Sequence, residues 1–306
     1  MPIYKITKGK LTSIEEKKIN LEVDLQKLVE KNLEIIFGLK FVSSEFSLKN
    51  FRIDTLAFDE ENKAFVIIEY KRDRNFSVID QGFSYLSLML NNKAEFILEY
   101  NEKTKKNLER KDVDWSQSRV LFLANSFTPY QRNAINFRDL PIELWEVKKY
   151  EDNIILFSQL KPLVARESIK TISKNKVIEK VSKEVKVYSI DDHFRPGWET
   201  SREMFEELRE KILAIDNRIE EKVNKFYIGY KIGFFNICSI HVHKSSLYIH
   251  LVRVDKNDLD DPEGKVEKVP WKKRGWGKLC GYIVKSQDDI PYALFLIKQV
   301  YNKFYK

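Results

Sequence analysis

The chain has 306 residues, of which 33% are charged, with 54 lysines and arginines against 46 acidic residues and a net charge of +8. This length accommodates two domains with separate cores, and the basic balance suits a polyanionic partner, although a soluble basic protein without one is the plain alternative. No apolar run reaches the length of a membrane span and no signal peptide opens the sequence, which disfavours a transport role. With only two cysteines, the sequence predicts a cytoplasmic protein rather than a disulfide-stabilised one.

The first predicted helix spans residues 21–37. Its apolar residues recur along one side, and Gly38 follows where the helix should end. At about 100° of rotation per residue, Glu22 falls on this apolar side, whereas Glu30 turns toward solvent. The plain explanation for Glu22 is an exposed first-turn acid that the helix dipole favours.

A β-hairpin is predicted next, because two apolar runs of strand length, residues 53–58 and 64–71, flank a short charged turn. In the register that this turn favours, Asp54 lies directly opposite Glu69. Two carboxylates then share one place on the sheet.

The face of the hairpin that carries these acids should be buried. Since strand side chains alternate between faces, Glu69 and Lys71 point to the same side as Phe65 and Ile67. Two acids and a lysine on an apolar face are costly unless a divalent cation lies between the acids. Carboxylate oxygens suit Mg²⁺. We therefore predict a metal site at Asp54 and Glu69, with a buried ion pair that holds no metal as the alternative.

This set of residues has a counterpart in a known group of enzymes. Asp54 on one strand, followed by Glu69 and Lys71 on the next, resembles the PD-(D/E)XK nuclease superfamily. The proline in that name is absent here, because Arg52 and Ile53 precede the aspartate. The position varies across the superfamily.

A second part of the resemblance lies in the following helix, which we predict from Ser77 as its N-cap to about residue 90. Gln81 and Tyr85 resemble the Gln-x-x-x-Tyr extension of recombination-type exonuclease branches. Four residues apart, they share one side of the helix. That side would face Lys71 if the helix packs back across the hairpin. The resemblance covers roughly residues 20–160.

The resemblance implies an α/β fold with a restriction-endonuclease-like mixed sheet flanked by helices. It also implies a Mg²⁺-dependent activity, with Mn²⁺ able to substitute, that cleaves DNA and leaves a 5′-phosphate. Asp54 and Glu69 would hold the metal, and Lys71 would assist the attacking water. Gln81 would fix the nucleophile or the scissile phosphate, and Tyr85 would support Gln81.

The superfamily often adds an acid from its first helix to the metal site. Glu22 is the candidate that this resemblance implies, and Glu30 is the substitute. The exposed first-turn acid described above remains the alternative for Glu22.

The rest of the first domain, residues 1–160, is predicted to complete an α/β layer. A helix should begin at Thr128, and strands are predicted at residues 94–99, 120–123, 142–147 and 154–157. Residues 161–187 carry eight lysines and arginines against three glutamates and are predicted as a basic interdomain linker, for which a partly helical form is left open. A phosphate contact there is the alternative to a solvated connector.

Residues 188–306 are predicted to form a smaller α+β domain. Helices are expected near residues 200–215, 218–224 and 289–304, and a hairpin at residues 237–242 and 247–254. The pattern resembles an uncharacterised domain appended to several bacterial nuclease-like proteins. By itself this implies no activity.

One loop of this domain interleaves aromatic residues with positive charges at Lys272, Lys273, Arg274 and Trp276. Such a combination can stack on bases while it neutralises phosphates, so we predict a nucleic-acid contact. The alternative is a pair of core tryptophans with basic residues outside.

The predicted hairpin of this domain places His241 opposite His250 and His243 opposite Tyr248. The imidazoles then share one face, as a metal site, a ligand face or an ordinary solvent-side strand. Cys238 points to the other face, which excludes a Cys/His zinc site.

Taken together, the sequence predicts a Mg²⁺-dependent deoxyribonuclease, active as a homodimer or with a partner subunit. One alternative is a nucleic-acid-binding or interaction protein without turnover. Another is a subunit of a multi-component restriction, defence or repair system. No P-loop motif occurs, so any motor would be a separate protein.

Overall fold

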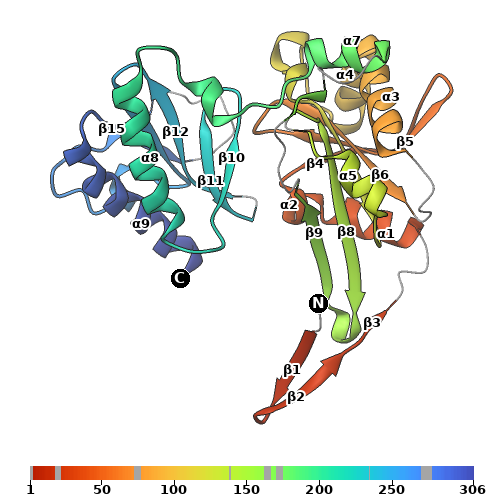
Figure 1. Ribbon diagram of the computed structural model, residues 1–306, viewed down its shortest axis with the longest axis horizontal. Coiled ribbons are helices and arrows are strands. Elements are labelled where there is room, and N and C mark those ends of the chain that lie inside the picture. The colour runs from red at the N-terminus through yellow and green to blue at the C-terminus, as the bar shows by residue number, and fades with distance from the viewer. Residues whose placement is uncertain are drawn as a thin grey trace. The chain divides into compact units, whose positions relative to one another are not determined.

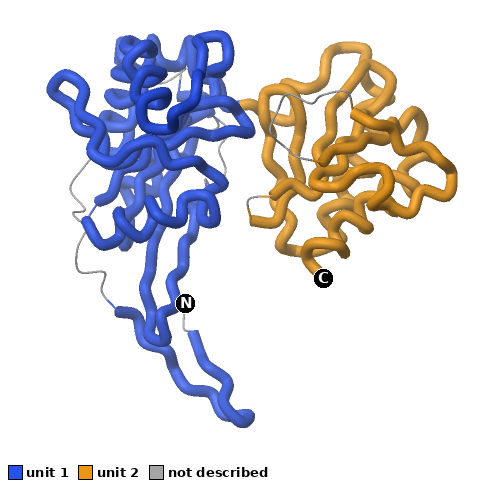
Figure 2. The backbone as a smooth tube through the Cα atoms, turned by 180° about the vertical axis from the view of Figure 1, so that it is seen from behind, with its two compact units in different colours: residues 1–187 blue, residues 188–306 orange. Residues whose placement is uncertain are grey.

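The computed structural model describes residues 3–17, 22–71, 77–137, 139–161, 167–169, 175–233, 235–269 and 278–306. It divides into two compact units, residues 1–187 and 188–306 (Figure 2). The second unit begins at Tyr188, where the sequence placed the start of the C-terminal domain. Among the described residues, no helix is long and apolar enough to cross a membrane.

The first unit is built on a seven-stranded mixed sheet with the order β3-β8-β7-β6-β5-β4, in which β9 also pairs with β8 (Figure 1). The β6–β7 and β7–β8 pairs are parallel and the others are antiparallel. The strands are β3 (Glu16–Lys17), β4 (Lys40–Leu48), β5 (Phe51–Asp59), β6 (Ala64–Lys71), β7 (Arg119–Ala124), β8 (Ile142–Tyr150) and β9 (Ile155–Leu160).

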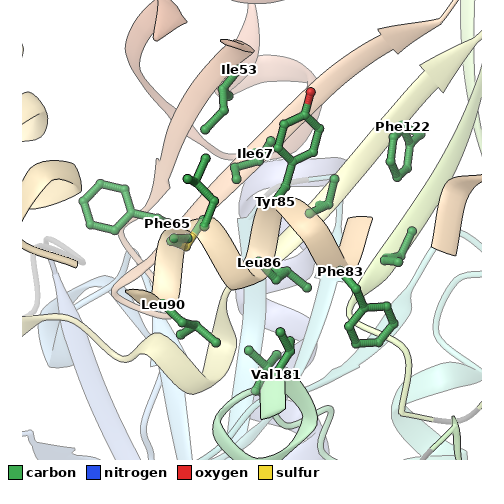
Figure 3. Close-up of a cluster of buried hydrophobic side chains, with 14 of the residues drawn as sticks. Ile53, Phe65, Ile67, Phe83, Tyr85, Leu86, Leu90, Phe122 and Val181 are labelled. Atoms are coloured by element: carbon green, nitrogen blue, oxygen red, sulfur yellow. The ribbon is translucent and has the colours of Figure 1, made fainter. Parts of the chain in front are cut away.

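Helices cover both faces of this sheet, which confirms the predicted fold class. The helices are α1 (Glu22–Lys31), α2 (Leu33–Phe37), α3 (Val78–Asn91), α4 (Lys93–Thr104), α5 (Pro129–Ala134) and α7 (Lys176–Glu184). Val66 and Ile68 of β6 join a core under α1 and α2. Phe65 and Ile67 point to the other face, into a core formed with α3 and α4 (Figure 3). The sheet therefore separates two apolar layers, as alternating side chains require.

Two local predictions in this unit are corrected. Residues 94–99 form helix α4 rather than a strand. Phe96, Ile97 and Tyr100 are its buried residues, and this spacing of one and four positions is helical, not alternating. The first predicted helix breaks into α1 and α2, although Gly38 ends it in the left-handed conformation (φ 64°), as expected.

The structure of the predicted basic linker, where it is described, differs from that of a solvated connector. Its residues 176–184 form α7, whose Ile178 and Val181 are buried in the core that α3 shares. Figure 3 shows Val181 beside Leu86 of α3. The lysines lie on the other side of an amphipathic helix. This part of residues 161–187 therefore packs as a helix of the first unit instead of running through solvent.

The first unit also carries an N-terminal hairpin that the sequence did not predict. It consists of β1 (Ile3–Thr7) and β2 (Lys10–Ile14), which form a two-stranded sheet of their own. In Figure 1 the hairpin projects beyond the end of β8 and β9.

The second unit has an antiparallel six-stranded sheet in the order β10-β11-β12-β13-β15-β14, with α8 (Glu199–Leu213) and α9 (Ile290–Tyr305) packed on it. Its strands are β10 (Glu220–Val223), β11 (Ile228–Ile232), β12 (Phe235–His243), β13 (Ser246–Val252), β14 (Glu267–Lys268) and β15 (Leu279–Val284). The helix expected at residues 218–224 is wrong, because Glu221 pairs with Tyr230 in an antiparallel ladder.

The predicted register of the β12–β13 hairpin is off by two residues. His241 lies opposite Tyr248, and His250 lies opposite Ser239, because the turn falls at Lys244 and Ser245. A shift of two preserves the faces, so Cys238 is buried in the core away from the histidines, as expected. The predicted DNA-contact residues Lys272, Lys273, Arg274 and Trp276 lie outside the described residues.

Candidate active site

The candidate site lies where β5 and β6 run side by side. Their antiparallel register pairs Thr55 with Ile68, and continuing it by one residue sets Asp54 level with Glu69. Here a side chain takes the place of a backbone acceptor between the strands: Asp54 Oδ2 accepts a hydrogen bond from the Tyr70 backbone N–H at 3.0 Å. The Asp54 carboxylate is thereby fixed against β6.

Glu69 connects the strand residues to the following helix. Its Oε1 accepts hydrogen bonds from Lys71 Nζ at 2.8 Å and from Gln81 Nε2 at 3.2 Å. Glu69 is 5% exposed. Gln81 reaches it because α3 starts at the Ser77 N-cap, whose side chain accepts the Asp80 N–H, and then runs across this face of the sheet. The structure therefore brings together all four residues for which the sequence predicted a catalytic role.

Tyr85 lies one turn beyond Gln81, where it was expected to support it. Its hydroxyl accepts from Gln81 Nε2 and donates to the Arg52 carbonyl, each at 3.3 Å. Burial, reinforced by the negative charge of Glu69, raises the pKa of Tyr85. The phenol therefore stays neutral. It connects α3 to β5 through its hydrogen bonds and does not act as a general base.

Close approach of α3 to the sheet depends on Gly82, the residue after Gln81. A Cβ at this position would come within 2.4 Å of Ile142 Cδ1 and 2.9 Å of its Cγ1 on β8. Only glycine fits without a shift of Ile142. The same glycine therefore sets how near the Gln81 side chain comes to Glu69.

The electrostatics of the two acids favour a bound cation. Burial, and next the negative charge of Glu69, raise the pKa of Asp54 to about 7, although the Tyr70 N–H opposes this rise. The second oxygen of Glu69, Oε2, is buried and has no hydrogen-bond partner among the described residues. A hard divalent cation would satisfy this oxygen and remove the repulsion. Asp54 and Glu69 thus fit Mg²⁺ by their donor chemistry.

Among the described residues, no third side chain is placed to join this pair in holding a metal. Within the described ranges, no group of three or more His, Cys, Asp or Glu residues is placed to hold a metal ion. Glu22, the acid expected from the first helix, begins α1, but its side chain lies outside what the structure describes.

The substitute acid, Glu30, lies behind the sheet. Its Oε1 accepts from Thr55 Oγ1 at 2.6 Å, and Thr55 points to the face opposite Asp54. The prediction that Glu30 turns toward solvent is therefore wrong. It supports β5 from the α1 side.

Two residues near Asp54 were missed by the sequence. Gln26 of α1 is buried and donates through Nε2 to the Asp54 carbonyl at 2.9 Å. Glu45 lies opposite Asp54 in the register of β4 and β5, and its charge adds to the rise in the pKa of Asp54. Glu45 pairs with Arg52 at 2.5 Å and adopts a left-handed φ of 54°. A polar residue on the apolar side of the first predicted helix was a signal for Gln26; Glu45 had none, because β4 was not predicted.

Comparison with known proteins sets the chain in a family. No protein-family model matches it. It is 44% identical over 301 residues to an uncharacterised protein of Haemophilus influenzae, and the match covers 98% of this chain and 99% of the relative. The chain belongs to the same family as this Haemophilus influenzae protein. The match runs through both units of this chain, since it covers nearly its whole length.

Solved structures give weaker likenesses. A repair endonuclease from Pyrococcus abyssi has 17% identity and a TM-score of 0.23, over 40% of this chain and 45% of that chain. EndoMS in a complex with dsDNA has 14% identity and a TM-score of 0.21, over 42% and 57%. SfsA of Pyrococcus furiosus in complex with Ca²⁺ has 13% identity and a TM-score of 0.25, over 50% and 77%. Scores this low carry no argument, so the fold class rests on the sheet and helices of the chain itself.

Proposed function

We propose that the first unit is a Mg²⁺-dependent nuclease that hydrolyses DNA phosphodiester bonds. The observation that carries this proposal is the pair of half-buried Asp54 and buried Glu69, with a lysine 2.8 Å from one Glu69 oxygen and no hydrogen-bond partner for the other among the described residues. Paired carboxylates with an adjacent ammonium suit a metal-assisted attack on a phosphate.

The metal would be held by Asp54 and Glu69, with Mn²⁺ as a substitute. When bound, it supplies Lewis-acid stabilisation of the negative charge that develops on the phosphate. The Tyr70 N–H holds one oxygen of the Asp54 carboxylate, which limits the reorientation of this carboxylate.

The chain's other groups act on the water and the phosphate. Lys71 offers a compact positive charge beside Glu69, which can orient the attacking water and offset the charge of the transition state. Gln81 carries both a donor and an acceptor, so it can hold the water or a phosphate oxygen while Tyr85 fixes its amide. The water oxygen forms the new bond to phosphorus, the bond to the 3′ oxygen breaks, and that oxygen takes a proton. The product keeps a 5′-phosphate.

The test is a nuclease assay on the whole chain. Purified protein with Mg²⁺ or Mn²⁺ is incubated with linear, nicked, flapped and single-stranded DNA, beside Asp54→Asn and Lys71→Met. Glu95→Gln, which changes an exposed acid of α4, is the matched control. We expect cleavage by the wild type and the control only. Equal cleavage by all four proteins would remove the catalytic assignment.

A second function is favoured by one observation: the described residues provide only two acids for the metal. The chain is then a nucleic-acid-binding or interaction module, or a subunit of a restriction, defence or repair system that cleaves only with its partner. A module of the first kind shows no Mg²⁺-linked stabilisation. A subunit of the second kind shows this stabilisation but does not cleave DNA alone.

A further inference from the structure

The N-terminal hairpin has no neighbour in its sheet. Strands β1 and β2 pair from Ile3 with Ile14 to Thr7 with Lys10, and no other described strand joins them. The turn residues Lys8 and Gly9 both have positive φ, 49° and 75°, which is the conformation of a tight two-residue hairpin turn. An isolated two-stranded hairpin is only marginally stable in water, so a hairpin of this kind usually needs a partner surface.

One face of the hairpin is apolar and exposed. Ile6 lies opposite Leu11, and Tyr4 lies two residues away on the same face. These side chains are 74%, 66% and 51% exposed, respectively. Apolar side chains gathered on one exposed face mark a binding surface.

The positive charge of the hairpin indicates the kind of partner that it binds. Residues 3–14 contain Lys5, Lys8 and Lys10 and no acidic residue. Lys5 is anchored by Asp152, 2.7 Å from its Nζ, in the turn that connects β8 to β9. Lys8 and Lys10 are exposed at and beside the tip. Because Asp152 offsets the charge of Lys5, the other two lysines, Lys8 and Lys10, contribute a local charge of +2 to the projecting ribbon, which is complementary to a polyanion.

We propose that the β1–β2 hairpin is an arm that binds duplex DNA. A groove of B-DNA admits a two-stranded β-ribbon, and apolar side chains can insert against base steps while lysines contact phosphates. A second copy of the chain would explain the apolar face, but two ribbons with only positive charges repel each other. The inference rests on the proposed function in taking DNA as the partner of the chain.

The experiment measures binding without cleavage. The whole chain is titrated onto a fluorescent duplex in EDTA over a series of salt concentrations. Ile6→Ser with Leu11→Ser removes the apolar face, and Lys8→Gln with Lys10→Gln removes the charge at the tip. The matched controls are Ile35→Ser, an isoleucine of α2 that is 71% exposed, and Lys244→Gln, a lysine in the β12–β13 turn.

The two double variants should fail in different ways. The lysine variant should reduce the slope of log K against log salt by about 1.8, because each phosphate contact contributes about 0.9. The serine variant should weaken binding about tenfold at every salt concentration and leave the slope unchanged. The controls should bind like the wild type. If the serine variant loses the hairpin altogether, the lysine variant still tests the proposal.

Two results would contradict the proposal that the hairpin binds DNA. In the first, both double variants bind duplex DNA like the wild type. In the second, the serine variant converts a dimer into a monomer on sedimentation while DNA binding is unchanged, which makes the face a self-association surface. The nuclease assay separates this inference from the proposed function. If cleavage depends on Asp54 and both double variants bind DNA normally, only the proposal of a DNA-binding arm is wrong. If DNA binds through the hairpin but is not cleaved, only the proposed nuclease function is wrong.

Discussion

Lys71 Nζ lies 2.8 Å from Glu69 Oε1, while Glu69 Oε2 is buried without a hydrogen-bond partner among the described residues. The lysine thus compensates only one of the two oxygens. A buried carboxylate with one unsatisfied oxygen costs free energy, and a bound cation recovers that cost.

Removing the charge of Glu69 should abolish metal-linked stabilisation. We expect Mg²⁺ to raise the free energy of unfolding of the wild type, by about 2.7 kcal/mol at a concentration 100 times its Kd. Glu69→Gln should show no such rise. Thermal melts over a Mg²⁺ series measure the effect, with Glu95→Gln as the control that keeps it. An equal Mg²⁺ response in Glu69→Gln would place the metal elsewhere.

The raised pKa of Asp54 makes the stability of the metal-free chain depend on pH. Between its ordinary pKa of 3.8 and the folded value of about 7, the folded state binds the proton more tightly than the unfolded state. Stability therefore falls as pH rises through this window, by at most about 1.4 kcal/mol per pH unit, and the contribution is constant outside it.

Asp54→Asn isolates this contribution, because the amide does not titrate. We expect the variant to gain stability relative to the wild type as pH rises from about 4 to about 7, with no further gain above. Urea denaturation in EDTA at a series of pH values measures the difference. Parallel curves for the two chains would contradict the raised pKa.

Gln81 and Tyr85 should affect cleavage to different degrees. Gln81→Ala removes the amide that bonds Glu69, and we expect a loss in kcat of about 10²-fold. Tyr85→Phe removes only the hydroxyl that holds this amide, so we expect a loss of about tenfold in kcat with little change in KM. Steady-state cleavage kinetics measure both. A larger loss for Tyr85→Phe than for Gln81→Ala would assign the direct role to Tyr85.

Helix α7 should contribute to the stability of the first unit. Val181 is buried against α3, so Val181→Ala should cost about 2 kcal/mol through the cavity that it leaves. Val177, in the same helix, is 39% exposed, and Val177→Ala should cost less than about 0.5 kcal/mol. Urea denaturation of the whole chain compares the two. Equal small effects would mean that α7 is only loosely attached.

The parts of the site that lie close together in the sequence were predictable. A short turn and strict alternation determine which residues of β5 and β6 face each other, and therefore align Asp54 with Glu69. Helical spacing likewise places Gln81 and Tyr85 on one side of α3. The α/β layer of the first unit was predictable for a similar reason, since many of its strands and helices have a clear period, whereas the restriction-endonuclease-like sheet was implied by the family resemblance.

The missing parts depend on contacts between distant segments. Gln26 meets Asp54 across 28 residues, and Glu45 reaches it from β4, a strand whose polar residues hide its alternation. Helix α4 was taken for a strand because a short apolar run fits both periods. Helix α7 was assigned to a partly helical linker and not to the first unit, because its lysines outweigh a narrow apolar side that packs against α3.

The hydrogen bond from the Tyr70 N–H to Asp54 has an evolutionary consequence. A main-chain donor does not depend on the side chain, so any non-proline substitution at position 70 that preserves strand β6 leaves the aspartate aimed as it is. Proline alone, which lacks the N–H, would release it. The orientation of this carboxylate is thus inherited from the geometry of the peptide backbone and does not require a particular side chain at its donor.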